Sequence, residues 1–374
     1  MAHQPRSSRA KSRGAGTASE PRPSTTLGTN GDHVVILGAG SVGCFIGGAW
    51  LAAGCSVSFV GRERIRDDIA ANGLALSDHA GWRVHLAHDL IDFSTRPAAL
   101  AKADIVALCV KSSDTAAAAK QIATHGKKKP VVISFQNGVG NADTLRTLLP
   151  KLEVVQGMVP FNVANLGKGR FHKGTSGELV AGETEATRAL AERIGDRPGR
   201  LRLAQDMKAV AWGKLLINLN NAVNALSGET LLEQLGKRDY RRVVAASIVE
   251  ALDLLKAAGI EPAQIGPLPP RLLPHAIAAP DFIFKNLLLR VQKIDARARS
   301  SMADDLAAGR ETEIDYLNGE VVRLAAALGR EAPVNSAIVS LVKQREAGVE
   351  QLWSPDQLRK YVLEGHRGVA IFGY

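Results

Sequence analysis

A glycine-rich turn between a strand and a helix constrains the fold of this chain more than any other feature. In HVVILGAGSVGCFIGGAWLAAGCSVSFVGR, residues 33–62, a β-branched run leads into a helix of small residues, and a second strand, SVSFV, follows. Gly38, Gly40 and Gly43 form a G-x-G-x-x-G pattern at the strand-to-helix junction. Gly38 would permit the tight turn, Gly40 the close approach of a phosphate, and Gly43 close packing of helix on strand. The stretch predicts one βαβ unit of a nucleotide-binding sheet.

The amino end of this helix is suited to phosphate. The N–H groups of Ser41, Val42 and Gly43 have no partner inside the helix, and the helix dipole adds partial positive charge there. We therefore predict that these residues, with Gly38 and Gly40, hold the pyrophosphate of a dinucleotide. A glycine turn with a purely structural role is the alternative.

The end of the second strand bears on the choice of dinucleotide. A site that prefers NAD usually has an acidic residue there, which holds the ribose 2′-hydroxyl, whereas this chain has Gly61 and Arg62. A guanidinium can pair with a 2′-phosphate through two hydrogen bonds. We predict NADP (NADPH) as the cofactor, with Arg62 as the discriminating residue. Arg64 and Arg66 could share this task, and a solvated basic turn is the alternative.

Polar residues end two further apolar runs, DIVALCVK (104–111) and VVISFQNGVGN (131–141). In open parallel sheets, ligands bind at the carboxyl ends of the strands. We therefore expect Lys111, Gln136 and Asn137 to reach the cofactor or the substrate. Asn137 followed by glycine is also a good turn signal.

Apolar periodicity divides the chain into two domains. In residues 32–204 short strand-like segments predominate, and we expect those between 153 and 182 to add antiparallel strands to the sheet. In residues 205–348 the apolar positions follow a helical period. The predicted fold class is α/β, with an N-terminal Rossmann-type dinucleotide-binding domain followed by an all-α C-terminal domain. Residues 349–374 form a C-terminal extension, and the basic residues 1–31, poor in large apolar side chains, are expected to be disordered.

The net charge of +10 does not by itself indicate nucleic acid. Part of it lies in the tail, and the rest is dispersed without a zinc-finger or helix-turn-helix pattern, so an anionic small ligand explains it equally well. The most apolar stretch, 44–60, is interrupted by glycines and is too broken to span a membrane. We expect neither nucleic acid nor a membrane as a partner.

The cysteines indicate the compartment. Cys44, Cys55 and Cys109 have apolar or small neighbours and no paired metal spacing, which predicts reduced thiols in a cytoplasmic protein. His85 and His88 are close in sequence, but no further ligand follows them, so we expect no metal site.

The second half carries polar residues at helical spacing. Lys214 and Asn218 are four residues apart and face the same way on a helix. Asn218 and Asn224 belong to an asparagine-rich stretch, which is unfavourable inside a helix unless the amides bind something polar, such as a ligand. A lysine with its ammonium in solvent is the alternative for Lys214.

The segment SSMADDLAAGRETEIDYLNGEVV, 300–322, is acidic and favourable to helix throughout. As one helix, it would place Ser301 and Glu313 a little over three turns apart, with Asp305 between them, along one side of a cleft. A solvated amphipathic face is the simpler alternative.

Taken together, GAGSVG, VKSSDT, QNGVGN, AWGKLLIN and SSMADDLAAGRETEIDYLNG resemble the ketopantoate reductase (2-dehydropantoate 2-reductase) family. The resemblance covers roughly residues 33–345. It implies NADPH-dependent reduction of 2-dehydropantoate to pantoate, a step toward pantothenate and coenzyme A, in a cleft between the two domains.

The resemblance also implies roles for individual residues. Lys214 matches the general acid, Glu313 the residue that orients the substrate and this lysine, and Ser301 a substrate contact. The remaining matches are Asn218 on the substrate side, and Lys111 and Asn137 near the cofactor.

One departure leaves the substrate open. Many members carry a second asparagine eight residues after the catalytic lysine, where this chain has Ala222, with Asn221 and Asn224 on either side. We expect Asn224 to bind substrate, and the sequence leaves open which of these two asparagines takes the place of the missing one. The alternatives are a related reductase of another 2-keto acid or an opine-like substrate, and a non-catalytic NADP-binding sensor. A homodimer is possible.

Overall fold

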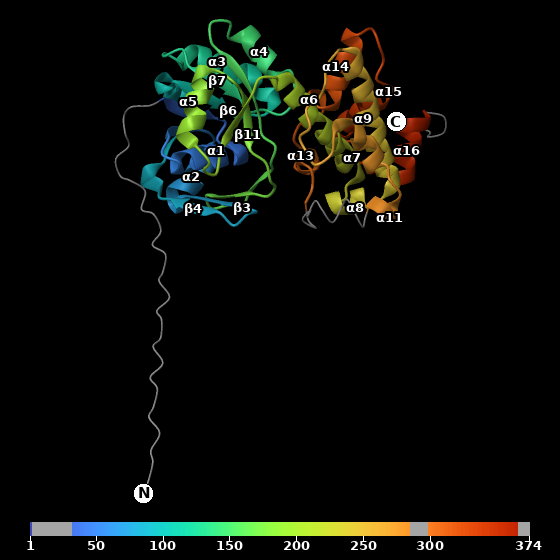
Figure 1. Cartoon of the computed structure of the whole chain (residues 1–374), viewed down its shortest axis with the longest axis horizontal. Helices are drawn as coiled ribbons and strands as arrows, with labels where there is room; N and C mark the ends of the chain where they lie inside the picture. The colour runs from blue at the N-terminus through green and yellow to red at the C-terminus, as the bar shows by residue number, and fades with distance from the viewer. Residues whose placement is uncertain (2–31, 285–297, 366–374) are drawn as a thin grey trace.

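The computed structural model describes Met1 and residues 32–284 and 298–365. The predicted disordered tail therefore lies outside the described residues, apart from Met1, as does the end of the C-terminal extension. Figure 1 shows an α/β domain beside a helical domain, with α6 (Met207–Asn218) between them. The predicted fold class, a Rossmann-type domain followed by an all-α domain, is confirmed.

An eight-stranded sheet organises the first domain. Its order is β12-β11-β8-β7-β6-β1-β2-β5, and the six strands from β8 to β5 are parallel. Because β1 has β2 on one side and β6 on the other, strand order reverses at the end of β1, where the glycine turn lies. The strands are β1 (His33–Leu37), β2 (Ser56–Val60), β5 (Asp92–Ser94), β6 (Ile105–Leu108), β7 (Val131–Ser134), β8 (Val154–Met158), β11 (Leu179–Gly182) and β12 (Leu201–Ala204).

The expectation that the segments of residues 153–182 add antiparallel strands to this sheet is confirmed for one segment and wrong for the others. Within it, β8 is parallel to β7, and only β11 is antiparallel to its neighbour β8. The other two segments, β9 (Val163–Asn165) and β10 (Arg170–Lys173), join β3 (Leu74–Asp78) and β4 (Arg83–Leu86) in a second sheet of order β4-β3-β10-β9. Gly169 makes this possible, because a Cβ there would lie 2.2 Å from the carbonyl oxygen of Gly73.

Helix α1 (Ser41–Ala52) lies between the two sheets, which explains its small residues. A Cβ on Gly47 would meet Phe59 and Ile36 of the large sheet, and one on Gly48 would meet Leu74 and Leu76 of the small sheet. The opposite face of the large sheet is covered by α3 (Thr115–His125) and α4 (Asn141–Leu148). The remaining helices of this domain are α2 (Glu63–Asn72) and α5 (Glu185–Ile194).

The second domain has no strand among its described residues. Its apolar residues form one core around α9 (Arg238–Ala257). The other helices are α7 (Asn220–Ser227), α8 (Leu231–Leu235), α10 (Leu273–Ile277), α11 (Asp281–Ile283), α13 (Ser301–Ala307), α14 (Asn318–Ala327), α15 (Pro333–Glu346) and α16 (Pro355–Glu364).

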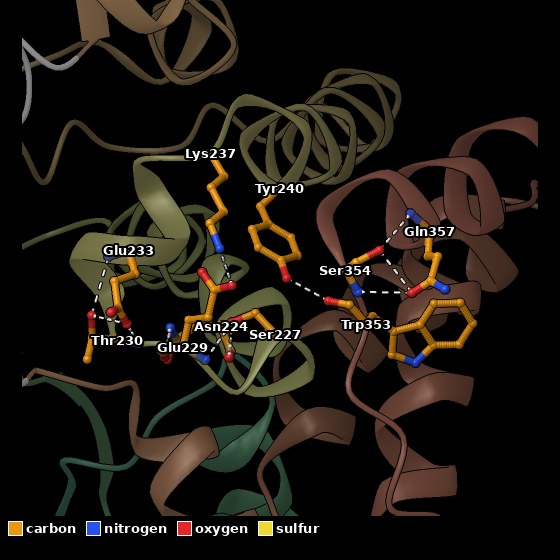
Figure 2. Close-up of polar contacts among 10 residues, drawn as sticks. All are labelled: Asn224, Ser227, Glu229, Thr230, Glu233, Lys237, Tyr240, Trp353, Ser354 and Gln357. Atoms are coloured by element: carbon orange, nitrogen blue, oxygen red, sulfur yellow. Dashed lines mark hydrogen bonds and ion pairs between the residues drawn. The ribbon is translucent and has the colours of Figure 1, made fainter.

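Helix α16 belongs to this core, although the sequence placed it in an extension. Leu358, Tyr361 and Val362 are buried with the residues of α9 and α15. In addition, the hydroxyl of Tyr240 donates to the carbonyl of Trp353 at 2.6 Å, just before α16 (Figure 2).

The predicted single helix over 300–322 was wrong. Helix α13 ends at Ala307, a short 3₁₀ turn covers Ile314–Tyr316, and α14 begins at Asn318. Gly309 stops α13: its φ is +62°, its N–H donates to Leu306, and the next N–H donates to Asp305. This is the Schellman arrangement that ends many helices.

No helix in the described part of the chain is both long and apolar enough to cross a membrane.

Candidate active site

The three glycines of the turn differ in what surrounds them. Gly38 has a φ of +98°, and a Cβ there would lie 2.6 Å from the backbone nitrogen of Val110. A Cβ on Gly43 would lie 2.4 Å from the carbonyl oxygen of Gly38. Around Gly40, by contrast, a Cβ would meet nothing within 4 Å. The fold itself therefore needs Gly38 and Gly43, whereas Gly40 faces an open space.

The amino end of α1 beside that space is free to bind an anion. Gly40 occupies the N-cap position, no side chain caps the helix, and Ser41 and Val42 are partly exposed. A bare helix end that opens onto a space kept clear by a glycine fits the pyrophosphate of a dinucleotide. The residues present thus fit a dinucleotide.

Of Arg62, Arg64 and Arg66, only Arg62 does not form an ion pair with an aspartate of α2. Arg64 lies 3.8 Å from Asp68, and Arg66 lies 2.8 Å from Asp67. Arg62 is exposed at the N-cap of α2, directly after the end of β2, and forms no ion pair within the described residues.

A small cavity lies where α6 meets the carboxyl ends of β7 and β8. Lys214 and Asn218 both line it, as their spacing predicts, and Asn137 faces them from the loop after β7. The full lining is Gln136, Asn137, Gly138, Gly157, Met158, Val159, Ala211, Lys214, Leu215 and Asn218. The cavity therefore combines polar groups of both domains, and one of them is cationic.

Lys214 is an unusual lysine. Its side chain is largely buried, and burial lowers its pKa to about 8. No carboxylate in the described part of the chain pairs with its ammonium. An amine with such a pKa can give up a proton near neutral pH far more readily than an exposed lysine.

Glu313 does not contact Lys214. Its carboxylate accepts hydrogen bonds from the first domain instead: from the Nδ2 of Asn137 at 2.9 Å, and from the hydroxyl and the backbone nitrogen of Ser112 at 2.8 and 3.2 Å. The resemblance implies that Glu313 orients the substrate and Lys214, and in this arrangement no hydrogen bond or ion pair joins Glu313 to Lys214. Glu313 contacts the cavity lining through Asn137.

A second polar contact joins the domains beside the first. The Nζ of Lys111 lies 2.8 Å from Asp305 of α13, and Arg310 lies 2.9 Å from the same carboxylate. The structure thus gives Lys111 a partner across the cleft, at the end of β6. Asp305, expected near Glu313 on one helix, reaches the cleft from α13.

Asn224 and Ser301 lie elsewhere. Asn224 is fully buried, and its Nδ2 donates to the carbonyl of Glu229 at 3.0 Å (Figure 2). Its Oδ1 accepts from the backbone N–H of Ser300 at 2.9 Å. Both the nitrogen and the oxygen of this amide are hydrogen-bonded to backbone groups. The expectation that Asn224 contacts substrate therefore does not agree with its position. Ser301 is exposed in the first turn of α13 and does not line the cavity.

Behind Asn137 lie buried polar residues, of which Ser112, Thr115 and Asn141 were not predicted from the sequence. Asn141 donates to the carbonyl of Asn137 at 2.5 Å and to the hydroxyl of Ser112 at 2.9 Å. Thr115 in turn donates to Asn141 at 3.1 Å, and Gln136 donates to Thr115 at 2.8 Å. VKSSDT and QNGVGN had been noticed as motifs, but nothing in the sequence shows that their hydroxyls and amides meet. The described residues contain no group of His, Cys, Asp and Glu that could hold a metal ion.

Comparison with known proteins agrees with this two-domain arrangement. Residues 34–186 match the family model "Ketopantoate reductase PanE/ApbA", and residues 206–346 match its C-terminal counterpart. The chain is 27% identical over 330 residues to 2-dehydropantoate 2-reductase of Archaeoglobus fulgidus, covering 85% of this chain and 99% of that protein.

Solved structures give the same result. A PanE/ApbA family ketopantoate reductase from Ralstonia eutropha JMP134 has 30% identity and a TM-score of 0.71, over 84% of this chain and 98% of that one. A D-mandelate dehydrogenase solved with NADH and anilino(oxo)acetate shares the fold at 20% identity, with a TM-score of 0.67 over 84% of this chain and 98% of that one. The fold and site define a two-domain oxidoreductase. The chain belongs to the ketopantoate reductase family.

Proposed function

We propose that this protein reduces 2-dehydropantoate to pantoate with NADPH, as a step toward pantothenate and coenzyme A. The observation that carries the proposal is the buried, unpaired Lys214 in a cavity between the two domains, with its pKa lowered to about 8. The names of the relatives support the substrate, and the residues of the glycine turn support the dinucleotide.

The residues would share the work as follows. Gly38, Gly40 and the amino end of α1 hold the pyrophosphate, and Arg62 pairs with the 2′-phosphate. When bound, the reduced nicotinamide supplies a hydride to the keto carbon. Negative charge then develops on the carbonyl oxygen, and the ammonium of Lys214 donates the proton that neutralises it. Asn218, one turn further along α6, presents its amide to the same cavity.

The experiment that tests this follows oxidation of NADPH by purified protein with 2-dehydropantoate, with NADH and a panel of other 2-keto acids as comparisons. Fast oxidation that depends on 2-dehydropantoate supports the proposal. Turnover of another keto acid alone would identify a different reductase, and binding of NADPH without turnover of any keto acid would favour a sensor.

Arg62 gives a test of cofactor preference. Loss of a charge-assisted pair with the 2′-phosphate in Arg62→Ala should raise the KM for NADPH roughly 10- to 100-fold and leave that for NADH within about twofold. Arg64→Ala is the matched control, because Arg64 already pairs with Asp68. Equal effects of Arg62→Ala on both cofactors would contradict a role in recognising the phosphate.

Asn221 is the asparagine best placed to bind substrate in the absence of one at position 222. Ala222 is buried in the core, and the side-chain amide of Asn224 is hydrogen-bonded to backbone groups. Asn221 is only partly buried. It lies seven residues after Lys214, and Leu219, between α6 and α7, keeps helical dihedrals of −57° and −23°, so Asn221 follows the face that carries Lys214.

This placement predicts opposite results at neighbouring asparagines. Asn221→Ala should raise the KM for the keto acid several-fold without a change in melting temperature. Asn224→Ala should instead lower the stability by about 1 to 3 kcal/mol, because two buried backbone groups lose their partners. Thermal unfolding and steady-state kinetics of the two variants separate the roles, and a destabilised Asn221→Ala with normal KM would refute ours.

We also propose a cytoplasmic location, which the three free cysteines support. The homodimer remains a prediction.

A further inference from the structure

Ser112 is a buried serine at the junction of the two domains that the proposed chemistry does not use. It follows Lys111 at the carboxyl end of β6, begins a short 3₁₀ turn, Ser112–Asp114, and is 1% exposed. Its neighbour Ser113 is exposed. A buried hydroxyl is expected to form hydrogen bonds, and its partners indicate what it does.

The Ser112 hydroxyl has three polar neighbours and a single proton. Its oxygen accepts from Asn141 at 2.9 Å, and two oxygens can receive its proton: Oε1 of Glu313 at 2.8 Å and the carbonyl of Asn137 at 3.1 Å. The Asn137 carbonyl already accepts from Asn141 at 2.5 Å, and the Glu313 acceptor is a carboxylate. The shorter bond to a charged acceptor is the stronger one, so the proton points across the domain boundary to Glu313.

The two acceptors belong to different domains, which gives the hydroxyl two alternatives. With the domains together, Glu313 accepts from the hydroxyl and N–H of Ser112 and from the side chain of Asn137. When the domains separate, Glu313 leaves, and the only other acceptor within reach of the hydroxyl among the described residues is the backbone of Asn137. Asn137 lines the cavity with Lys214.

The surroundings keep this hydroxyl in place. Asn141 is 4% exposed and Thr115 is 3% exposed. The single proton of the Thr115 hydroxyl has two acceptors, the carbonyl of Ser112 at 2.7 Å and Oδ1 of Asn141 at 3.1 Å. On the Ser112 side the bond to Glu313 is thus shielded from solvent, although the carboxylate itself is partly exposed, so the bond keeps part of the strength that burial adds.

We propose that Ser112 is a positioning residue that couples closure of the two domains to the placement of Asn137 in the active-site cavity. Its hydroxyl donates to Glu313 in the closed arrangement and to the Asn137 carbonyl in the open one. The kinetic part of this proposal rests on the proposed function, whereas the effect on domain closure does not.

Ser112→Ala tests the proposal, with Ser113→Ala as the matched control. Because the bond of the hydroxyl to the charged Glu313 is stronger than its bond to the Asn137 carbonyl, the hydroxyl favours the closed arrangement. Ser112→Ala should therefore raise the KM for 2-dehydropantoate about tenfold and leave the Kd of NADPH within about twofold. Ser113→Ala should change neither. An equal loss of NADPH affinity, or an unchanged KM, would overturn the proposal.

A double-mutant cycle asks whether Ser112 acts through Glu313. In Glu313→Gln, whose neutral amide is a weaker acceptor, adding Ser112→Ala should change the KM by less than about twofold, since the bond is already weakened. Full additivity of the two substitutions would overturn the coupling. This cycle also guards against misfolding of Ser112→Ala, because Glu313→Gln weakens the same bond from the other domain.

Small-angle X-ray scattering of the same variants separates this proposal from the proposed function. If no keto acid is turned over, the proposed function fails, but Ser112→Ala and Glu313→Gln should still enlarge the radius of gyration of the NADPH-saturated protein relative to Ser113→Ala. Unchanged scattering in both variants would overturn the role of Ser112 in closure.

Discussion

Lys214→Met is expected to reduce turnover of 2-dehydropantoate by about 100- to 10,000-fold and, at the same time, to make the folded protein more stable. The first effect is the usual contribution of a positioned proton donor. The second follows from burial, since methionine fills a similar volume without a charge. NADPH affinity should stay unchanged, because the residues assigned to its phosphates, Gly38, Gly40 and Arg62, are not altered.

The size of the stability gain comes from the pKa. The ammonium of Lys214 has its pKa lowered from 10.5 to about 8 by burial. Below pH 8 the folded protein carries the full free-energy cost of the buried charge, and the pKa shift sets an upper limit of about 3 kcal/mol on that cost. Because the side chain is partly exposed, we expect a stability gain of about 1 to 3 kcal/mol from removing the charge. Urea unfolding at pH 7 measures the gain expected from Lys214→Met.

The same pKa sets two pH dependences. Between pH 8 and 10.5 the unfolded chain holds a proton that the folded protein has released, so this group makes the folded state more stable as the pH rises through that window. Catalysis runs the other way, because the donor must be protonated: kcat/KM for reduction should fall above about pH 8. Lys208→Met, at an exposed position on α6, should alter neither curve. A decline in kcat/KM that starts only near pH 10 would contradict the role of Lys214.

Gly43→Ala and Gly40→Ala should both bind NADPH more weakly, but for different reasons. In Gly43→Ala the new Cβ would lie 2.4 Å from the Gly38 carbonyl, so the turn must shift, with a loss of about 1 to 3 kcal/mol in stability. Affinity for NADPH should fall with it, by more than about tenfold, because the turn no longer presents its backbone to the phosphates.

Gly40→Ala is the informative partner of that variant. Its Cβ would meet no protein atom within 4 Å, and a φ of −89° suits alanine, so the free energy of unfolding should change by less than about 0.5 kcal/mol. The added methyl nevertheless enters the space assigned to the pyrophosphate, and NADPH affinity should drop about tenfold or more. Calorimetric titration measures the NADPH affinity, and thermal unfolding measures the stability. Normal NADPH binding by Gly40→Ala would contradict the assignment of the pyrophosphate to the space beside Gly40.

Features of the fold that depend on local sequence could be predicted. The glycine spacing indicated a strand, a turn and a helix because each position has its own steric requirement, and the four-residue spacing of Lys214 and Asn218 placed both in one cavity. The end of α13 could also have been predicted, because a glycine such as Gly309 commonly ends a helix. The acidic, helix-favouring residues on either side instead led to the prediction of one continuous helix.

Features that depend on distant parts of the chain could not be predicted. Ser112 and Asn137 meet within the first domain, at 3.1 Å, and only the docking of the two domains brings Glu313 within 3.2 Å of both. Asn224 shows the converse: its position in an asparagine-rich helix favoured a ligand, whereas its amide binds the backbone of Glu229 and Ser300.

The place of α16 in the core of the second domain has a consequence for biosynthesis. All strands of the first domain lie before residue 205, so that domain can complete its sheet while the ribosome is still translating the helices. The second domain needs Leu358, Tyr361 and Val362 to fill its core, and these are made after all the other buried residues of that core. The half of the molecule that holds Lys214 can therefore finish folding only after α16 has been synthesised, against a first domain that is already formed.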